Sequence, residues 1–217
     1  NSIQSLSADL SYSNLRGSLG KVDFEKGVHW NVVGGIDRAS GKTFPKLQGA
    51  LDIGEPLPFG HASFFLRSAA GYAWGDEKNP LAGFYLGGFG NNWVDHGDEK
   101  RYRKWYAFPG VDLNALGGRS FLKSTAELNL PPLRFERAGN AGFYMSHIRP
   151  AIFAGVAVMD PDRGSTRRTA WNAGAQLDLA ITTLNVLDLV VSVGQAVAFE
   201  PGGRKNYETM VSLKVLK

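Results

Sequence analysis

Three stretches near the end of the chain decide the fold: AWNAGAQLDLAI (170–181), LDLVVSVGQAVAF (187–199) and YETMVSLKVL (207–216). In each of them, apolar residues occupy alternate positions, and the positions between are mostly small or polar. Trp171, Leu177 and Ile181, for example, fall on one side of an extended chain, and Asn172 and Asp178 fall on the other. Side chains alternate between the two faces of a β-strand. Segments of about ten residues with this alternation, separated by tight turns, are typical of a transmembrane β-barrel.

A water-soluble sandwich or lipocalin-like barrel would show the same alternation. Two details favour the membrane. The segments are longer than the usual strand of about five or six residues and close to the roughly nine to eleven that cross a bilayer at a tilt. Their polar side also carries small residues, which would pack a dry core poorly. We therefore predict an all-β, antiparallel transmembrane β-barrel, with a soluble β-barrel binding module as the alternative.

Composition limits the other possibilities. The chain has 217 residues, enough for one domain over 1–217, with 27 glycines and 12% aromatic residues for turns and interfacial girdles. No run of eighteen apolar residues occurs, which excludes a helical membrane span. There is no cysteine, and hence no disulfide framework, thiolate nucleophile or zinc–thiolate site. A net charge of +4 is too small and too dispersed to indicate nucleic acid by itself.

The alternating pattern recurs along the whole chain and predicts nine strands. The six earlier ones fall at about 3–12, 28–36, 46–53, 64–74, 122–130 and 148–158. Single-chain bacterial barrels have even strand numbers, and an open edge in lipid leaves amides unpaired. Since the chain begins at Asn1 without Met or a signal peptide, we expect a processed product or a fragment. We therefore expect the C-terminal part of a larger barrel, with further N-terminal strands or a second copy supplying the missing edge.

The connections predict which end of the barrel faces outward. Residues 54–61 and 182–186 form short links, whereas 160–169 and 201–206 are longer and polar, as outside loops of bacterial barrels are. The longest irregular segment, Gly75 to Ser120, far exceeds an ordinary connection. We call it the long loop and predict that it is functional.

Two elements of the long loop carry a family resemblance. An aromatic-Leu-Gly-Gly element at 84–88 precedes Pro109-Gly110 and a second Leu-Gly-Gly at 116–118, and the following strand ends in Glu-Leu-x-x-Pro at 127–131. The residues that carry the loop motif are Phe84, Leu86, Gly87, Gly88, Pro109, Gly110, Gly117 and Gly118. Over about residues 60–217 this resembles the C-terminal barrel of the Omp85 family, the bacterial surface antigen (D15) group. The resemblance implies a sixteen-stranded outer-membrane barrel whose long outside loop folds back into the lumen and is followed by five strands.

The chain also departs from that family pattern. The family's loop has an Arg-Gly-aromatic tip whose arginine pairs with an aspartate of a Phe-x-Asp-x-Gly strand. Here the loop reads GNNWV at 90–94, without that arginine, and the strand reads FAGVA at 153–157, without the aspartate. Losing both partners together is physically coherent, because a lone buried charge is costly. The resemblance therefore predicts the barrel but not the family's usual lock between loop and wall, nor its insertase or secretion mechanism.

Charged residues at inward positions are the candidate functional residues of the wall. They are Arg67, Lys123, Glu127, Arg149, Asp178, Asp188, Glu208 and Lys214. Such residues can line a conduit and set its ion preference, or they can form a salt-bridge network that plugs a narrow lumen. On the last strand, Tyr207, Val211, Leu213 and Val215 should face lipid, and Glu208, Ser212 and Lys214 the lumen.

Two loop clusters admit several interpretations. KRYRKWY (100–106) mixes cations with aromatic residues, which could bind nucleic acid or lipopolysaccharide phosphates, or could be a solvated outside loop. Arg163, Arg167 and Arg168 offer the same choices. Asp95, His96, Asp98 and Glu99 could ligate a metal, although clustered loop acids are more often simply solvated. No HExxH, GxSxG, Walker or zinc-spaced motif occurs, so we predict no cofactor, no metal and no nucleic-acid partner.

These observations predict a non-enzymatic protein of the bacterial outer membrane. Its role would be that of a membrane anchor or a conduit. It would serve either protein translocation and assembly or an upstream domain. The expected partners are the lipid bilayer, lipopolysaccharide, the barrel-assembly machinery, and an upstream domain or passenger polypeptide. The alternative is an outer-membrane barrel enzyme acting on lipid or peptide, with Asp95, His96 and Asp98 as its acid–base group.

Overall fold

Nine long strands form one continuous sheet in the computed structural model, which describes residues 3–75, 79–90, 99–136, 138–140, 142–184, 186–200 and 202–216. The strands are β1 (Ile3–Ser13), β2 (Gly27–Ala39), β3 (Lys42–Pro56), β4 (Ser63–Ala73), β7 (Ser120–Asn129), β10 (Phe143–Met159), β11 (Arg168–Thr183), β12 (Leu187–Phe199) and β13 (Lys205–Leu216). The predicted all-β class and the nine strands are confirmed.

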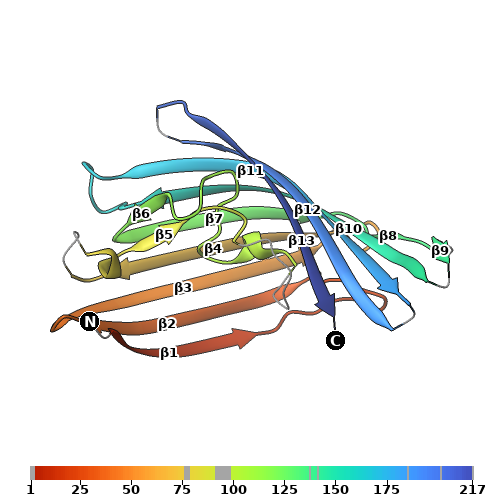
Figure 1. Ribbon diagram of the computed structural model, residues 1–217, viewed down its shortest axis with the longest axis horizontal. Helices are drawn as coiled ribbons and strands as arrows, with labels where there is room; N and C mark the ends of the chain where they lie inside the picture. The colour runs from red at the N-terminus through yellow and green to blue at the C-terminus, as the bar shows by residue number, and fades with distance from the viewer. Residues whose placement is uncertain are drawn as a thin grey trace.

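The sheet is a meander in which each long strand pairs antiparallel with the next one along the chain (Figure 1). The long loop leaves after β4 and returns at β7, and these two strands pair directly, from Ser63↔Asn129 to Tyr72↔Ser120. In the described part of the chain the sheet is open, with β1 and β13 as its edges. Because nine strands alternate in direction, β1 and β13 run in the same direction.

The remaining elements are short. β5 (Phe84–Leu86) pairs with β6 (Leu116–Gly118), and β8 (Leu133–Arg134) and β9 (Gly139–Asn140) pair with the beginning of β10. Two single 3₁₀ turns, η1 (Pro80–Ala82) and η2 (Arg101–Arg103), lie within the long loop. None of the helices in the described residues has the length and apolar character needed to cross a membrane.

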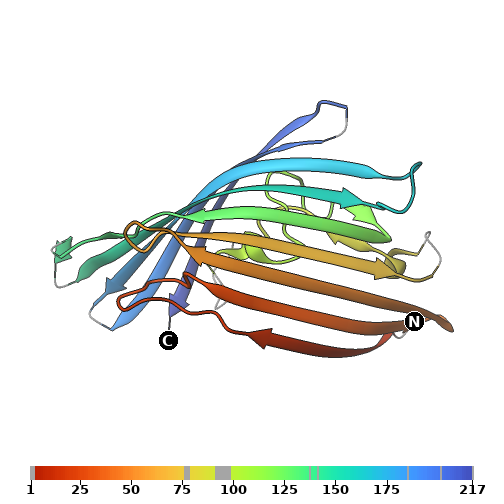
Figure 2. The same ribbon diagram turned by 180° about the vertical axis from the view of Figure 1, so that it is seen from behind.

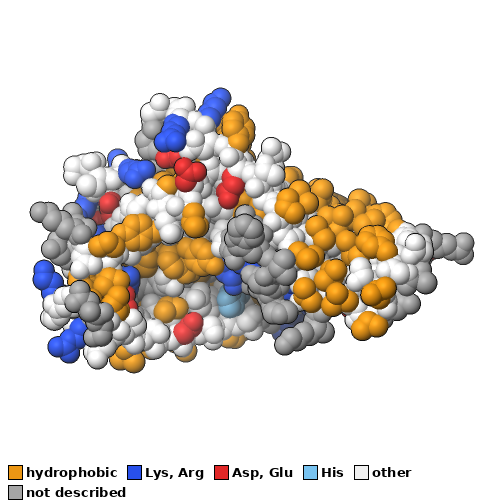
Figure 3. All heavy atoms as spheres, in the orientation of Figure 1, with side chains coloured by type: hydrophobic (Ala, Val, Ile, Leu, Met, Phe, Trp, Pro, Cys, Tyr) orange, Lys and Arg blue, Asp and Glu red, His pale blue; other side chains and the backbone are white. Residues whose placement is uncertain are grey.

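The two faces of the sheet differ as the alternation predicts. On β12, Val190, Ser192, Ala196 and Ala198 are buried on the concave face, whereas Val193 and Phe199 are exposed on the other face. The same convex face exposes Val32 on β2, Leu66 on β4 and Trp171 on β11. In the view of Figure 3, hydrophobic side chains gather over β12 and the strand ends beside it.

The long loop lies against one face of the sheet, in front of the strands in Figure 1 and behind them in Figure 2. Its large side chains pack on small inward residues of the wall. One cluster joins Phe84, Leu86, Phe108, Val111 and Leu116 of the loop segment to Ala69, Ala73, Phe121, Ala157, Met159, Ala170 and Ala198. A second cluster contains Phe89, Tyr102, Phe153, Ala196 and Met210.

The small inward residues therefore have a different role from the one expected. We interpreted them as unsuited to a dry core, but they leave the space that the loop's aromatic rings fill. A Cβ on Gly194 would lie 2.9 Å from the Phe89 ring. Gly110, at φ +92°, lies so close to β12 that a Cβ there would be 2.6 Å from the Ala198 nitrogen. Side chains of the concave face and of the long loop thus form the core together, in these two clusters.

Candidate functional site: the loop inside the concave face

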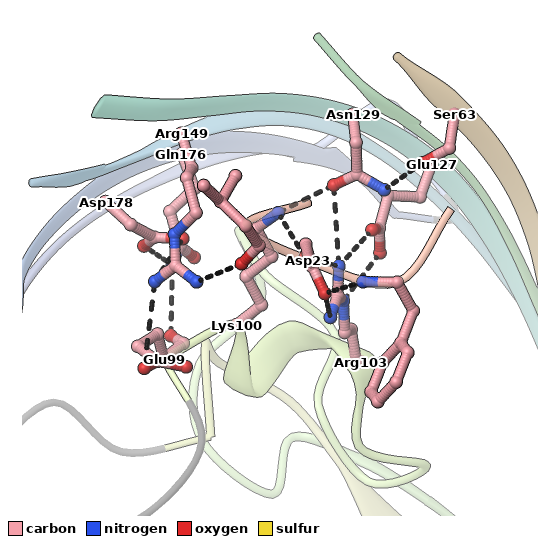
Figure 4. A network of polar contacts seen from close by, with 12 residues as sticks. Asp23, Ser63, Glu99, Lys100, Arg103, Glu127, Asn129, Arg149, Gln176 and Asp178 are labelled. Carbon is pink, nitrogen blue, oxygen red and sulfur yellow. Dashed lines mark hydrogen bonds and ion pairs between the residues drawn. The ribbon is translucent and has the colours of Figure 1, made fainter. Parts of the chain in front are cut away.

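The centre of the site is a carboxylate on β7. Glu127 is fully buried, and its two oxygens accept hydrogen bonds from Arg103 of the long loop at 2.6 and 3.1 Å. Arg67 on β4, the neighbouring strand, donates to Glu127 at 2.9 Å and to Asp52 on β3 at 2.6 Å. A guanidinium from the loop and one from the wall therefore share the same carboxylate. Figure 4 shows Arg103 beside Glu127.

A second acid reaches this centre from the connection between β1 and β2. Asp23 accepts from Arg103 Nη2 at 2.8 Å and from Lys100 Nζ at 3.0 Å. Lys100 also donates to Asn129 Oδ1 at 2.6 Å and is almost fully buried. Burial alone would raise the pKa of the Asp23 carboxyl, but the charges of Arg103 and Lys100 outweigh it and hold that pKa well below its usual range.

The charges at this centre balance. Three cations, Arg67, Lys100 and Arg103, face three acids, Asp23, Asp52 and Glu127. A buried charge without a partner costs several kcal/mol, on the order of 3–5 when one member of a pair is removed. The balance therefore makes it possible to bury the loop's cations against the wall.

A smaller polar cluster lies beside it, on β10, β11, β12 and β13. Glu99 of the loop contacts Lys214 at 3.1 Å and Arg149 at 3.7 Å. Arg149 also lies 3.9 Å from Asp178, a buried acid that accepts hydrogen bonds from Gln176 at 2.6 Å and from Ser192 at 2.7 Å. Figure 4 shows Glu99 below Arg149, Gln176 and Asp178.

The wall also binds the loop's backbone. The Lys123 ammonium donates to the carbonyls of Tyr102, Lys104 and Ala107, at 3.4, 2.7 and 2.5 Å. Asn172 donates to the Pro109 carbonyl at 2.9 Å. Such contacts satisfy loop carbonyls that the sheet ladder cannot reach.

Glu208 on β13 also binds the loop's backbone, but it accepts hydrogen bonds from amides and does not donate to carbonyls. Its carboxylate accepts from the amides of Phe89 at 3.0 Å and Gly110 at 2.9 Å. Hydrogen bonds to a carboxylate from backbone N–H groups are among the stronger ones in proteins.

The residues of the loop motif meet at its neck. Phe84 pairs with Gly118, Tyr85 with Gly117 and Leu86 with Leu116, so the first and second elements of the motif form the β5–β6 ribbon. Gly88 bridges to Phe108, next to Pro109 and Gly110. Gly87, at φ +157°, leaves no room for a side chain, because a Cβ there would lie 2.1 Å from the Asp112 carbonyl.

Space between loop and wall is minimal at the charged centre. A cavity of about 20 Å³ remains around Arg67, Arg103 and Lys123, and one of about 10 Å³ around Asp23 and Lys100. A single water needs roughly 10–15 Å³. The loop is therefore fitted closely to the wall at this level.

A family model for the OMP85 superfamily matches residues 7–156. This chain belongs to the OMP85 superfamily. The match covers all of the long loop and the strands on both sides of it. Searches of curated proteins and of solved structures gave no match to the chain.

OMP85 membership makes the lock between loop and wall informative. The sequence predicts that the family's usual arginine–aspartate pair is absent, and FAGVA at 153–157 indeed offers no acid on β10. A different pair is present, since Arg103 binds Glu127 on β7, the first strand after the loop. The sequence did not predict this pair, because Arg103 lies in KRYRKWY and not in the family's Arg-Gly-aromatic motif.

Of the interpretations of KRYRKWY, the solvated outside loop does not fit the described contacts of Lys100, Tyr102 and Arg103. Lys100 and Arg103 are bound inside the concave face, and Tyr102 is buried against Phe153 with ring centroids 4.3 Å apart. The combination of a cation-rich segment in the long loop with a wall rich in inward acids would have been the signal for this arrangement.

Seven of the eight predicted wall residues lie on the concave face in contact with the loop or with each other, as described above. Asp188 differs, since it is exposed near the beginning of β12 and accepts a hydrogen bond from Thr182 at 2.6 Å. Asp95, His96 and Asp98 lie outside the described residues. Among the residues that are described, no group of three or more His, Cys, Asp or Glu side chains could hold a metal ion.

Proposed function

We propose that this OMP85 protein acts in the bacterial outer membrane as a conduit or anchor for polypeptide, with the long loop as the plug of its lumen. OMP85 membership points to an outer-membrane protein. The observation that carries the proposal is the charged centre in which Arg67 of the wall and Arg103 of the loop share the Glu127 carboxylate, which ties the loop to the wall. A loop held this firmly inside a barrel controls what passes.

The convex face supports a membrane setting over a soluble binding module. Large apolar side chains are exposed along it from edge to edge, among them Leu6, Val32, Leu66, Leu122, Trp171, Val193 and Val211. Soluble proteins rarely expose contiguous apolar patches larger than a few hundred Å². In a barrel these side chains form the lipid-facing band.

Strand direction bears on how the barrel closes. Since β1 and β13 run in the same direction, pairing them with each other would join parallel strands. Two copies inserted with the same orientation would meet with the same problem. An odd number of further strands restores antiparallel pairing and an even total, as in bacterial barrels. This disfavours the second copy that the sequence left open.

The test is ion conductance of the full-length protein in planar bilayers. We expect low conductance from the parent protein, and wider or more frequent openings from Arg103→Ala, which removes the loop's contact with Glu127 and one of its two contacts with Asp23. Arg38→Ala, an exposed arginine on β2, is the matched control and should conduct like the parent protein.

The same recordings separate conduit from anchor. A rise in conductance with Arg103→Ala supports a lumen that opens when the loop moves. Unchanged conductance, in a variant whose loop has become sensitive to trypsin, would leave only the anchor role. Recovery of a monomeric, cooperatively melting protein without detergent would contradict both.

A further inference from the structure

The long loop contacts segments at both edges of the open sheet. One contact is to the β1–β2 connection (14–26), through Asp23, and the other is to β13, through Glu208 and Lys214. Both edges are therefore linked through the loop across the concave face, as well as through the nine strands of the sheet.

The first edge, at β1 and β2, is held to the loop by two cations. Asp23 binds Lys100 and Arg103, and its side chain is about one-fifth exposed. The connection that carries it is itself ordered, since Arg16 bridges to Lys26 and the Asn14 amide donates to the Val28 carbonyl. A force on Asp23 is therefore transmitted directly to β1 and β2.

Other contacts hold this connection to the wall without the loop. Glu25 contacts His61 at 2.7 Å and accepts from Ser18. Arg149 donates to the Val22 carbonyl at 3.3 Å, and Arg134 donates to the Gly20 carbonyl. These contacts keep the connection folded when Asp23 alone is altered, which makes Asp23 a clean position to test.

The second edge, β13, is held to the loop mainly by two backbone amides. Glu208 accepts from Phe89 and Gly110, which lie far apart in the loop, so its carboxylate also ties two loop segments together. Lys214, further along β13, contacts Glu99. Met210 packs in the same cluster as Phe89. The edge strand is thus bound to the loop along much of its length.

We propose that the long loop is an internal strut that sets the separation of the two sheet edges, with Asp23 and Glu208 as its positioning residues. The middle of the loop is fixed to β7 by Arg103–Glu127 and by Lys123. With a fixed centre and a contact to each edge, the loop determines the curvature of the sheet, and hence the width of the gap between β1 and β13 that further strands fill.

The distance between the edges can be measured directly, because these 217 residues contain no cysteine. Spin labels on Ser7→Cys in β1 and Thr209→Cys in β13, both exposed positions, report the edge separation in the full-length protein in liposomes. We expect one narrow distance distribution. Asp23→Asn and Glu208→Gln should each broaden it and shift it to longer distances, and the double variant should shift it further.

Matched controls are Asp9→Asn on β1 and Asp188→Asn on β12, acids near the same edges for which the described residues show no contact with the loop. Both should leave the distribution unchanged. Glu208→Asp keeps the charge but shortens the side chain, and should give an intermediate shift if Glu208→Gln fails to fold. Unchanged distributions in Asp23→Asn and in the Glu208 variants, with heat-modifiable migration intact, would overturn the strut.

Discussion

The two ends of the sheet have the same sequence pattern but very different burial. Along β12, the inward residues from Val190 to Ala198 are buried and the outward ones are partly or fully exposed, whereas all residues of β1 are exposed, on both faces of the strand. The long loop accounts for the difference, because it packs on β3, β4, β7 and β10 to β13 and touches the β1–β2 end through the connection. Alternation therefore specifies which side chains point inward, and the loop decides which of them become core.

The largest effect on this contrast should come from Arg103→Ala. It leaves Glu127 and Asp23 with one fewer cation at a buried site, which costs about 3–5 kcal/mol. We expect a lower temperature for the heat-modifiable shift on a gel and faster trypsin cleavage of the loop. Arg38→Ala, exposed on β2, should change stability by less than about 0.5 kcal/mol. Equal losses of stability from the two variants would mean that the part of the sheet covered by the loop is no more constrained than the β1–β2 end.

Arginine substitutions on the two faces of β13 should differ next. Leu213→Arg places a charge on the lipid face and should cost about 2–4 kcal/mol near the bilayer midplane, abolishing assembly. Ser212→Arg, on the concave face, should be largely tolerated. Leu10→Arg places a charge on the lipid face of β1, and its assembly yield should be as low as that of Leu213→Arg. The measurement is the yield of heat-modifiable barrel, and similar yields for positions 212 and 213 would refute the assigned faces.

Glycine substitutions should give a smaller contrast. Gly110→Ala introduces a Cβ at φ +92° that would contact the Ala198 nitrogen, and strain of this kind costs about 1–3 kcal/mol. Gly34→Ala on β2 meets only a Leu47 methyl group at 4.0 Å and should be neutral or stabilise by up to about 1 kcal/mol. Urea midpoints of the two variants test this. A lower urea midpoint for Gly34→Ala would contradict the open space around this residue.

The smallest effect should be that of pH on the Asp23 contact. Its carboxyl has a depressed pKa in the folded state, so its contribution to stability is fully present above the unfolded value of about 4 and is lost as the pH falls below it. Between pH 7 and 5 we expect no change in proteolysis of the loop, here with a protease active at acidic pH. Below about pH 4 release should begin, and Asp23→Asn should weaken that step without removing it, because the pKa of the Glu99 carboxyl is lowered as well. Release already at pH 6 would indicate a different titrating group.

Most of the sheet could be predicted from the sequence, because the period of two is local and each strand carries its own facing information. Trp171 and Asn172, for instance, are assigned to opposite faces from their immediate neighbours alone. The loop contacts could not be predicted in this way. Asp23 and Arg103 are 80 residues apart, and neither belongs to a motif. The resemblance implied a loop folded into the lumen, and only the structure identified Glu127 as its partner.

The Glu208 contacts also bear on the kinetics of folding. The hydrogen bond from Phe89 spans 119 residues and the contact from Glu99 to Lys214 spans 115, so neither can form until the last strand has been added to the sheet. Contacts with such large sequence separation slow folding, because a long chain must be closed before they contribute any free energy. Docking of the loop should therefore be a late and slow phase, preceded by a nascent sheet whose concave face is still open to water and to chaperones.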